Sequence, residues 1–293
     1  MANPRPVCLH PDAAGWPAGW RDLPEPPASV HVTGDLSCLG ARAVAVVGTR
    51  AATARGLAVA RRLGRDLAAR GWVVVSGLAF GIDAAAHEGA LEAGGRTVAV
   101  MATPPERTYP ARHRDLRRRL EARGCAVTES APGAEVAGRW LFPRRNRLIA
   151  GLVEGVIVVE APHRSGALVT AALAADLGRT VWAVPGPVDS AVSAGCHQLL
   201  RDGACLCEGV ADIDPVLAPP RQGAVPPLPR PATGSAAAWI LDRLDLDGTP
   251  LAELRGRWSG TDAMWHEGLL ALELAGLIRR LPGGLLAPRI WLA

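Results

Sequence analysis

Six short, continuously apolar runs limit the possible fold of this 293-residue chain more than any other feature. They span 43–48, 72–77, 97–102, 125–130, 155–161 and 180–186, and the connections between them can hold helices. A strand that is apolar at every position is buried on both faces, as in a parallel sheet covered by helices. The rhythm therefore predicts an α/β protein with a doubly wound, mostly parallel sheet.

Composition changes on either side of this region and suggests further segments. We expect an irregular N-terminal segment at 1–40, because it is rich in Pro, Gly and Trp and has little periodicity, and the sheet domain at 41–214. The Pro-rich stretch 215–232 reads as a linker. Residues 233–293 predict three helices and a short hairpin turning on Gly283-Gly284, the layout of a small winged-helix-like domain.

Several classes of protein are excluded by what the sequence lacks. No apolar run approaches the roughly 18 residues that span a bilayer, and the start lacks the order of a signal peptide, so we expect a cytoplasmic protein with no membrane contact. Six scattered cysteines show no metal-ligand spacing, which predicts reduced thiols and no metal site. No glycine fingerprint for a dinucleotide is present, and no cofactor is predicted.

Glycine-containing turns follow the first two predicted strands. Backbone N–H groups and hydroxyls in such turns can bind an anion, although a merely tight strand-to-helix connection explains either turn equally well. Ser76 stands where an adenosine-binding enzyme needs an acidic residue, which argues against a nicotinamide enzyme. The candidate residues in these turns are Gly48, Thr49, Arg50, Ser76, Gly77, Phe80 and Gly81.

The segment FPRRNRLIAG (142–151) places cations where a helix begins. Pro143 suits the first helical position, and the helix dipole already makes that end positive, so either acidic partners or an anionic ligand must neutralise the arginines. At about 100° per residue, Arg145 falls on the apolar side, with Arg144 and Arg147 beside it. We therefore predict ligand contacts from Phe142, Arg144, Asn146 and Arg147, with Arg145 bracing the pocket through an acidic partner.

Positive charge and aromatic rings gather in the same part of the chain. Residues 101–150 hold eleven arginines and five acidic residues, whereas the whole chain has a formal net charge of only +4. Tyr109 and Arg112 lie near the predicted sheet edge, and the run 117–119 predicts a solvated helix face. Ser165 is a predicted helix cap. Arginines interleaved with aromatic rings suit single-stranded nucleic acid, although ordinary packing is the alternative for each ring.

No catalytic constellation is recognisable. His87 has no nucleophile as partner and is better interpreted as a packed residue, Asp83 as a structural residue at a helix start, and there is no Walker lysine. The sequence therefore predicts a binding protein and not an enzyme.

Six motifs in order resemble those of the DNA processing protein A family (DprA, also called Smf). They are VAVVGTRAATARG, SGLAFGIDAAAHEGAL, YPARHRDL, FPRRNRLIAG, VVEAPHRSGALVTAALAADLGRTVWAVPG and LLRDGACL, within 43–214. The resemblance implies an extended Rossmann-like domain that binds single-stranded DNA, protects it during natural transformation, loads RecA recombinase and forms a homodimer. Carried over by motif, the DNA contacts include Ser165, Gly166 and Thr170 beside the residues named above.

This sequence departs from the family pattern in three places. Met101-Ala102-Thr103-Pro104-Pro105 stands where members usually carry a glycine-rich turn, so we do not expect a phosphate cradle there. His197 replaces the usual asparagine. About 40 residues leave no room for the N-terminal helical domain of many members.

Two other functions compete with this interpretation. A nucleotide phosphoribohydrolase-like enzyme could use the same glycine turns, but VPGPVDS does not supply that group's PGGxGT-type turn. A transcription factor could use the predicted winged helix, but its candidate recognition segment, TDAMWHEGLLALELAG, contains no arginine.

Overall fold

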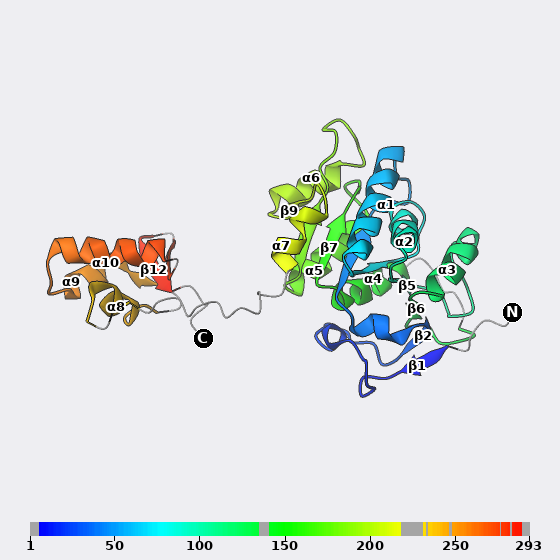
Figure 1. Ribbon diagram of the computed structural model, residues 1–293, viewed down its shortest axis with the longest axis horizontal. Helices are drawn as coiled ribbons and strands as arrows, with labels where there is room; N and C mark the ends of the chain where they lie inside the picture. Colours follow the sequence, from blue (N-terminus) through cyan, green and yellow to red (C-terminus); the bar gives the residue numbers. More distant parts are fainter. Residues whose placement is uncertain are drawn as a thin grey trace. The chain divides into compact units, whose positions relative to one another are not determined.

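The computed structural model describes residues 6–134, 141–217, 231–232, 234–245, 248–275, 277–281 and 283–288. The chain divides into two compact units, Met1–Leu217 and Ala218–Ala293 (Figure 1). Among the described helices, none has the length and apolar character that crossing a membrane requires.

The first unit is built around a nine-stranded sheet with the order β1-β2-β6-β5-β4-β3-β7-β8-β9. All neighbours from β6 to β9 run parallel, whereas β1 and β2 pair antiparallel at the β6 edge. The α/β class and the mostly parallel sheet are therefore confirmed. The strands are β1 (Val7–Leu9), β2 (Val30–Gly34), β3 (Ala43–Val47), β4 (Val73–Ser76), β5 (Thr97–Met101), β6 (Cys125–Thr128), β7 (Gly155–Val158), β8 (Thr180–Ala183) and β9 (Cys205–Leu206).

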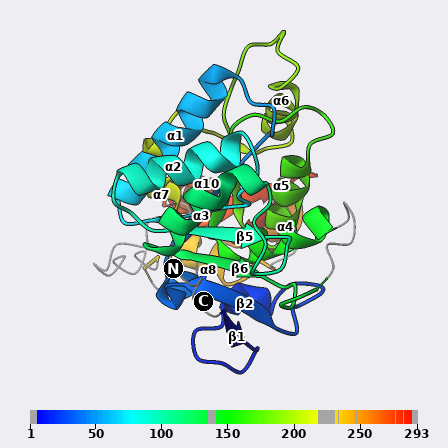
Figure 2. The same cartoon turned by 90° about the vertical axis from the view of Figure 1, so that its right-hand side faces the viewer.

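Helices cover both faces of this sheet, which explains why its central strands are apolar throughout. Every residue of β3 is buried, and its side chains alternate between two cores. One face packs against α1 (Ala54–Ala69), α2 (Ile82–Glu92) and α3 (Arg114–Glu121). The other packs against α4 (Leu141–Leu152) and α5 (Gly166–Asp176). Figure 2 shows β5, β6, β2 and β1 following one another toward the edge of the sheet.

The remaining elements of the first unit are short. They are the helices α6 (Ala194–Arg201) and α7 (Asp214–Leu217) and the 3₁₀ turns η1 (Ala18–Trp20), η2 (Leu36–Gly40), η3 (Ala111–His113) and η4 (Val210–Asp212).

The N-terminal segment differs from the expected irregular lead-in. It supplies β1 and β2 and buries Trp16, Trp20 and Leu23 in the core beneath α4. Trp20 is fully buried, and its indole Nε1 donates to the carbonyl of Leu148 at 2.9 Å. Short edge strands separated by Pro-rich turns show little hydrophobic periodicity, so the sequence did not indicate that this segment adds strands and core residues to the domain. The segment therefore braces the helix that carries the site arginines.

The second unit contains the three helices and the hairpin expected from the sequence. Thr261 caps α10 by accepting a hydrogen bond from Met264 N. Its core gathers tryptophans, with the ring centroids of Trp239 and Trp258 5.2 Å apart. The assignment to the winged-helix class stays a prediction. The elements are α8 (Ala236–Leu241), β10 (Thr249–Pro250), α9 (Leu251–Arg257), α10 (Asp262–Leu274), β11 (Ile278–Leu281) and β12 (Leu285–Pro288).

Replacing Trp20 tests whether the N-terminal segment braces the domain. Trp20→Ala removes a fully buried indole and its hydrogen bond to Leu148, so we expect a loss of about 3–5 kcal/mol in the free energy of unfolding. Urea unfolding of the full chain measures it. Val188→Ala is the control, because that side chain is 93% exposed and its truncation should change stability by less than about 0.5 kcal/mol. A Trp20→Ala protein as stable as the control would show that the segment does not brace the sheet.

Candidate nucleic-acid interface

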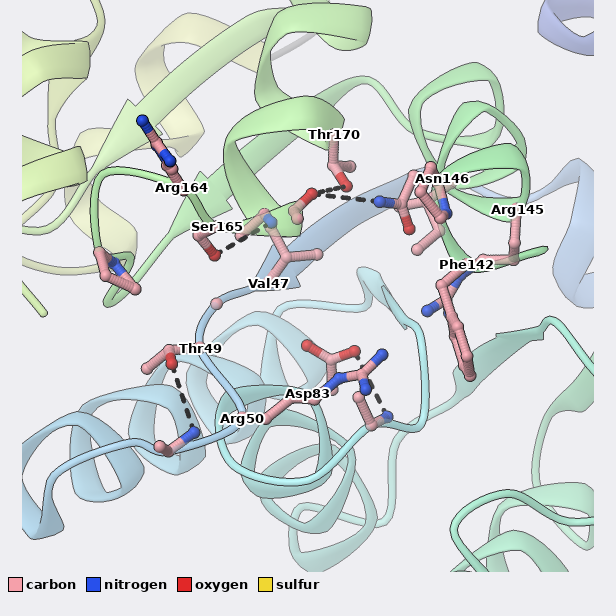
Figure 3. Close-up of a pocket in the computed structure, with 18 of the residues that line it drawn as sticks. Val47, Thr49, Arg50, Asp83, Phe142, Arg145, Asn146, Arg164, Ser165 and Thr170 are labelled. Atoms are coloured by element: carbon pink, nitrogen blue, oxygen red, sulfur yellow. Dashed lines mark hydrogen bonds between the residues drawn. The ribbon is translucent and has the colours of Figure 1, made fainter. Parts of the chain in front are cut away.

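A cavity of about 630 Å³ opens where the strand order reverses, between the carboxyl ends of β3 and β7 (Figure 3). In open α/β sheets this switch point is where ligands bind. Nine of the residues predicted from the sequence line the cavity: Gly48, Thr49, Arg50, Tyr109, Phe142, Asn146, Ser165, Gly166 and Thr170. The lining does not include the other seven predicted residues, which are Ser76, Gly77, Phe80, Gly81, Arg112, Arg144 and Arg147.

The turn after β3 is held in place by Glu160, which lies two residues after the neighbouring β7. Thr49 N donates to the Glu160 carbonyl at 2.7 Å, and the Glu160 carboxylate accepts from Thr53 N at 2.9 Å and from Thr53 Oγ1 at 2.5 Å. Thr53 in turn caps α1. Arg50 is thus presented to solvent from a backbone that has little freedom. Sequence reasoning missed Glu160, although an acidic residue ending an apolar strand was a usable signal.

The turn after β4 packs against the first turn and under Arg145. Gly81 has a φ of +76°, and a Cβ there would clash with the carbonyl of Thr49. A Cβ at Gly77 would overlap the guanidinium of Arg145. The carboxylate of Asp83 accepts hydrogen bonds from Gly77 N at 3.0 Å and Ala79 N at 3.4 Å. Both glycines are therefore required for the close approach of the two turns and of Arg145.

Arg145 forms the floor of the cavity and not merely its support. It is buried, lines the cavity and donates to the carbonyl of Val100. Burial lowers the pKa of its guanidinium to about 10, and the carboxylate of Asp83 opposes this shift while the positive charge of Arg50 adds to it. Burial likewise raises the pKa of Asp83, against the opposite effect of Arg145. Among the described residues no carboxylate lies within 4.0 Å of Arg145, so the acidic partner expected for it is a neighbour and not a contact ion pair.

The N-terminus of α5 forms the opposite wall. Ser165 caps the helix by accepting from Ala167 N at 3.2 Å, as the sequence predicted. Asn146 of α4 donates to the carbonyl of Gly166 at 3.1 Å, which ties the two helices together at the cavity. The side chain of Thr170 donates to the same carbonyl at 3.4 Å. Arg164, which directly precedes the cap and was not predicted, is exposed and lines the cavity.

Three helix N-termini therefore converge on one edge. The start of α5 lines the cavity directly, Asp83 in the first turn of α2 lines it, and Ala51 does so three residues before α1. Each helix N-terminus carries about half a positive charge from its dipole. Together with Arg50, Arg145 and Arg164 they make this crevice suitable for an anion.

Two of the chain's three Phe and Tyr residues line this cavity. The sequence has two Phe and one Tyr, namely Phe80, Phe142 and Tyr109. The Tyr109 and Phe142 rings lie 5.5 Å apart, and the Arg50 guanidinium stands 4.7 Å over the Phe142 ring. Tyr109 is 52% exposed and Phe80 is 41% exposed. Exposed rings beside free cations form a surface on which flat, negatively charged ligands can stack.

Two of the predicted arginines take a different position from the one expected. Helix α4 begins at Leu141, so Pro143 is not its first residue and the arginines fall later in the helix. Arg147 is buried and pairs with Glu129 at 2.6 Å, and the more exposed Arg144 pairs with the same carboxylate at 3.2 Å. Glu129, from the strand end after β6, could not be assigned to them from sequence spacing. Arg145 is buried, as the helical pattern predicted, but Arg147 is buried as well, and of the three arginines Arg145 is the one that lines the cavity.

Other arginines around the cavity have no such partner. Within the described ranges, Arg50, Arg112 and Arg164 are exposed and form no ion pair with a carboxylate. Elsewhere on the described surface some arginines are paired, as Arg119 is with Glu88 at 2.8 Å, and others, such as Arg55 and Arg201, have no ion pair. Positive charge is therefore left unneutralised where the cavity opens.

His87 is packed, as the sequence suggested. It is fully buried on α2, and its Nδ1 lies 2.7 Å from Thr97 Oγ1, whose hydroxyl proton goes to the carbonyl of Val74 at 2.6 Å. Nδ1 must therefore carry the ring proton, and the buried Nε2 has no hydrogen-bond partner in the described part of the chain. Burial lowers the pKa of this imidazole to about 3. Within the same residues, no group of three His, Cys, Asp or Glu side chains could hold a metal ion.

His197, the residue that departs from the family pattern, lies on α6 away from the cavity lining. Its Nε2 is 3.1 Å from the carbonyl of Gly186.

The fold and the site define an α/β protein with a switch-point crevice bordered by arginines and aromatic rings. The family model of DNA recombination-mediator protein A matches residues 7–217, from the first strand to the end of the first unit. The chain belongs to that family.

Curated relatives and solved structures agree with this assignment. A putative DNA processing protein DprA from Mycobacterium tuberculosis is 54% identical over 172 residues, covering 59% of this chain but only 44% of the relative. Protein Smf from Escherichia coli is 33% identical over 97% of this chain and 78% of its own length. The crystal structure of DNA processing protein A from Streptococcus pneumoniae aligns with a TM-score of 0.68 and 35% identity over 72% of this chain and 74% of that one.

A fourth comparison concerns a ligand. The structure of DNA processing protein A from Helicobacter pylori, described in terms of its single-stranded DNA binding mode, aligns with a TM-score of 0.65 and 26% identity over 74% of this chain and 98% of that one.

The buried neutral His87 predicts a specific dependence of stability on pH. The pKa of His87 in the folded protein lies below the value of 6.5 for an unfolded histidine. The stability that the neutral His87 contributes to the folded state is therefore complete above pH 6.5 and is lost as the pH falls toward 3. His87→Asn should flatten the fall in unfolding free energy between about pH 6.5 and pH 4 by about 1.4 kcal/mol per pH unit. Urea unfolding at a series of pH values measures the slope.

The exposed His163→Asn variant is the control and should retain the wild-type slope. An unchanged slope in His87→Asn would mean that His87 accepts a proton in the folded protein.

Proposed function

We propose that this chain is a non-enzymatic recombination mediator that binds single-stranded DNA and delivers it to RecA recombinase. The observation that carries the proposal is the gathering of unpaired arginines, three helix N-termini and the Tyr109 and Phe142 rings around one cavity. The single-stranded DNA binding of the similar Helicobacter pylori protein supports the same ligand. Loading of RecA, a role in natural transformation and a homodimer formed through the Rossmann-like unit rest on the family alone.

The geometry suggests that different residues of the site bind the phosphates and the bases of the DNA. A phosphate would bind the backbone N–H and the guanidinium of Arg50 and the N-terminus of α5, with Arg164 beside it. Bases next to that phosphate would stack on Tyr109 and Phe142, whose rings are already close together. Stacking on an exposed ring requires an unpaired base, which favours a single strand over a duplex.

The proposal assigns direct contact to some of the predicted residues and support to others. Gly77 and Gly81 shape the turns, and Arg147 is held by Glu129. Ser76 is fully buried and donates to the carbonyl of Val46, so it also belongs to the support. Phe80, Arg112 and Arg144 lie outside the cavity lining but have exposed atoms, and a longer strand would reach them.

Two arginine variants should differ in their effect on binding. Arg50 has no ion pair among the described residues, whereas Arg144 is already partly neutralised by Glu129. Arg50→Ala should therefore weaken binding of oligo-dT by about 1–3 kcal/mol, and Arg144→Ala by clearly less. Fluorescence anisotropy at several salt concentrations measures both the affinity and the number of phosphates that the protein neutralises. The slope of log affinity against log salt should fall by about 0.7 for each phosphate that a variant no longer neutralises.

Arg118→Ala is the matched control, because Arg118 is 80% exposed on α3 and pairs with Asp115. The proposed binding site would be refuted if the affinity of the wild-type protein for oligo-dT did not depend on salt. It would also be refuted if wild type, Arg50→Ala and Arg144→Ala bound oligo-dT with equal affinity.

Delivery to RecA requires its own test. On oligonucleotides covered by a single-strand-binding protein, the full chain should shorten the lag before RecA hydrolyses ATP, and Arg50→Ala should lose that effect in proportion to its weaker DNA affinity. The ATPase of RecA on bare DNA is the control. A wild-type chain that binds DNA but leaves the lag unchanged would limit the function to DNA binding.

A further inference from the structure

Arg117 differs from its neighbours in the run of three arginines on α3. The sequence predicted a solvated face for all three, and Arg118 and Arg119 are 80% and 44% exposed. Arg117, however, is only 3% exposed and lies on the side of the helix that buries Leu116 and Leu120. The prediction is therefore wrong for Arg117, because one arginine of a helical run turns inward when tertiary partners satisfy it.

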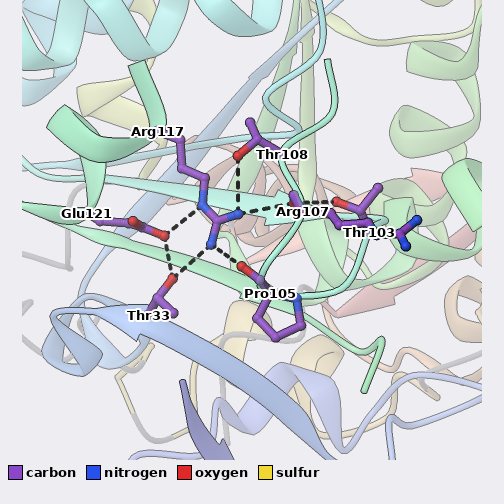
Figure 4. A network of polar contacts seen from close by, with 7 residues as sticks. All are labelled: Thr33, Thr103, Pro105, Arg107, Thr108, Arg117 and Glu121. Carbon is purple, nitrogen blue, oxygen red and sulfur yellow. Dashed lines mark hydrogen bonds and ion pairs between the residues drawn. The ribbon is translucent and has the colours of Figure 1, made fainter. Parts of the chain in front are cut away.

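The guanidinium of Arg117 has partners on three sides (Figure 4). Nε pairs with Glu121 Oε1 at 2.7 Å, one turn along the same helix. Nη1 donates to the carbonyl of Arg107 at 3.1 Å, and Nη2 donates to the carbonyl of Pro105 at 2.5 Å. The same Glu121 oxygen accepts from Thr33 Oγ1 of β2 at 2.5 Å. Helix α3, strand β2 and the loop after β5 thus contact one another at the buried guanidinium of Arg117.

The loop that Arg117 holds, residues 102–110, leads directly to Tyr109. It contains no glycine and no regular secondary structure, so its carbonyls need partners from elsewhere in the protein. Inside the loop, Thr103 Oγ1 donates to the carbonyl of Arg107 at 2.9 Å, the carbonyl that also accepts from Arg117. Tyr109 follows two residues later, with its ring 5.5 Å from that of Phe142. The backbone that places the tyrosine ring is therefore anchored through Arg117.

We propose that Arg117, oriented by Glu121 and Thr33, is a positioning residue that sets Tyr109 for stacking on a DNA base. The inference rests on the proposed function, since it names a determinant of the same site. Arg117 makes no contact with DNA, because its charge is buried and paired. Its role requires a planar fork that reaches two carbonyls and a carboxylate at once, which a lysine ammonium cannot reproduce.

A double-mutant cycle on the full chain tests this positioning. Tyr109→Ala should weaken oligo-dT binding by roughly tenfold, as removal of one stacking partner predicts. Arg117→Lys should weaken binding several-fold, yet the double variant should bind no more weakly than Tyr109→Ala alone, because the tyrosine is then already absent. The salt dependence should stay unchanged in Arg117→Lys, since the variant neutralises the same phosphates as wild type.

Arg118→Lys is the control and should bind as wild type, because its side chain is exposed on the same helix. Thr33→Val removes only the hydroxyl that reaches Glu121, and it decides the question if Arg117→Lys does not fold. It should give a smaller decrease in affinity that also vanishes in the Tyr109→Ala background.

The outcomes separate this proposal from the proposed function. Three results would each overturn the positioning role, provided that the wild-type protein binds oligo-dT. The affinity losses of Tyr109→Ala and Arg117→Lys could multiply in the double variant, the salt dependence of binding could be weaker in Arg117→Lys, or Tyr109→Ala could bind as tightly as wild type. A wild-type chain that does not bind oligo-dT would overturn the function itself.

Discussion

The burial of the Arg145 guanidinium is the constraint on which the rest of the site depends. A buried charge is costly unless neighbouring groups compensate it, and here the carbonyl of Val100 and the nearby Asp83 do so only in part, since the buried Nε of Arg145 has no hydrogen-bond partner among the described residues. Gly77 is needed because a side chain there would occupy the space of the guanidinium. Positive charge that the protein does not neutralise is available to an anionic ligand in the cavity above it.

The same principle separates the arginines of this region by their partners. Arg147 is buried against Glu129, and Arg117 has Glu121 and two carbonyls, so these two side chains organise structure, while the exposed Arg144 is only partly neutralised by Glu129. Arg50 and Arg164 have no carboxylate partner in the described part of the chain and face the cavity. Residue type therefore says little about role here. Pairing and burial distinguish a structural cation from one that binds a ligand.

Much of the first unit could be predicted because the strands of a parallel sheet that is covered on both faces appear in the sequence as continuous apolar runs. The turns after β3 and β4 and the Ser165 cap followed from that pattern and from glycine and capping chemistry. The N-terminal strands were missed because β1 has three residues and its neighbourhood is rich in Pro and Trp. The burial of Arg147 was missed because its partner, Glu129, lies 18 residues away in the sequence and contacts it only in the folded protein.

The central claim is that single-stranded DNA occupies the switch-point cavity, and a crystal structure of the full chain with a short oligo-dT tests it most directly. The account predicts a phosphate within hydrogen-bonding distance of the Thr49–Arg50 turn or the N-terminus of α5, and a thymine stacked on Tyr109 or Phe142. DNA bound elsewhere on the molecule, with the cavity free of nucleotide, would contradict it.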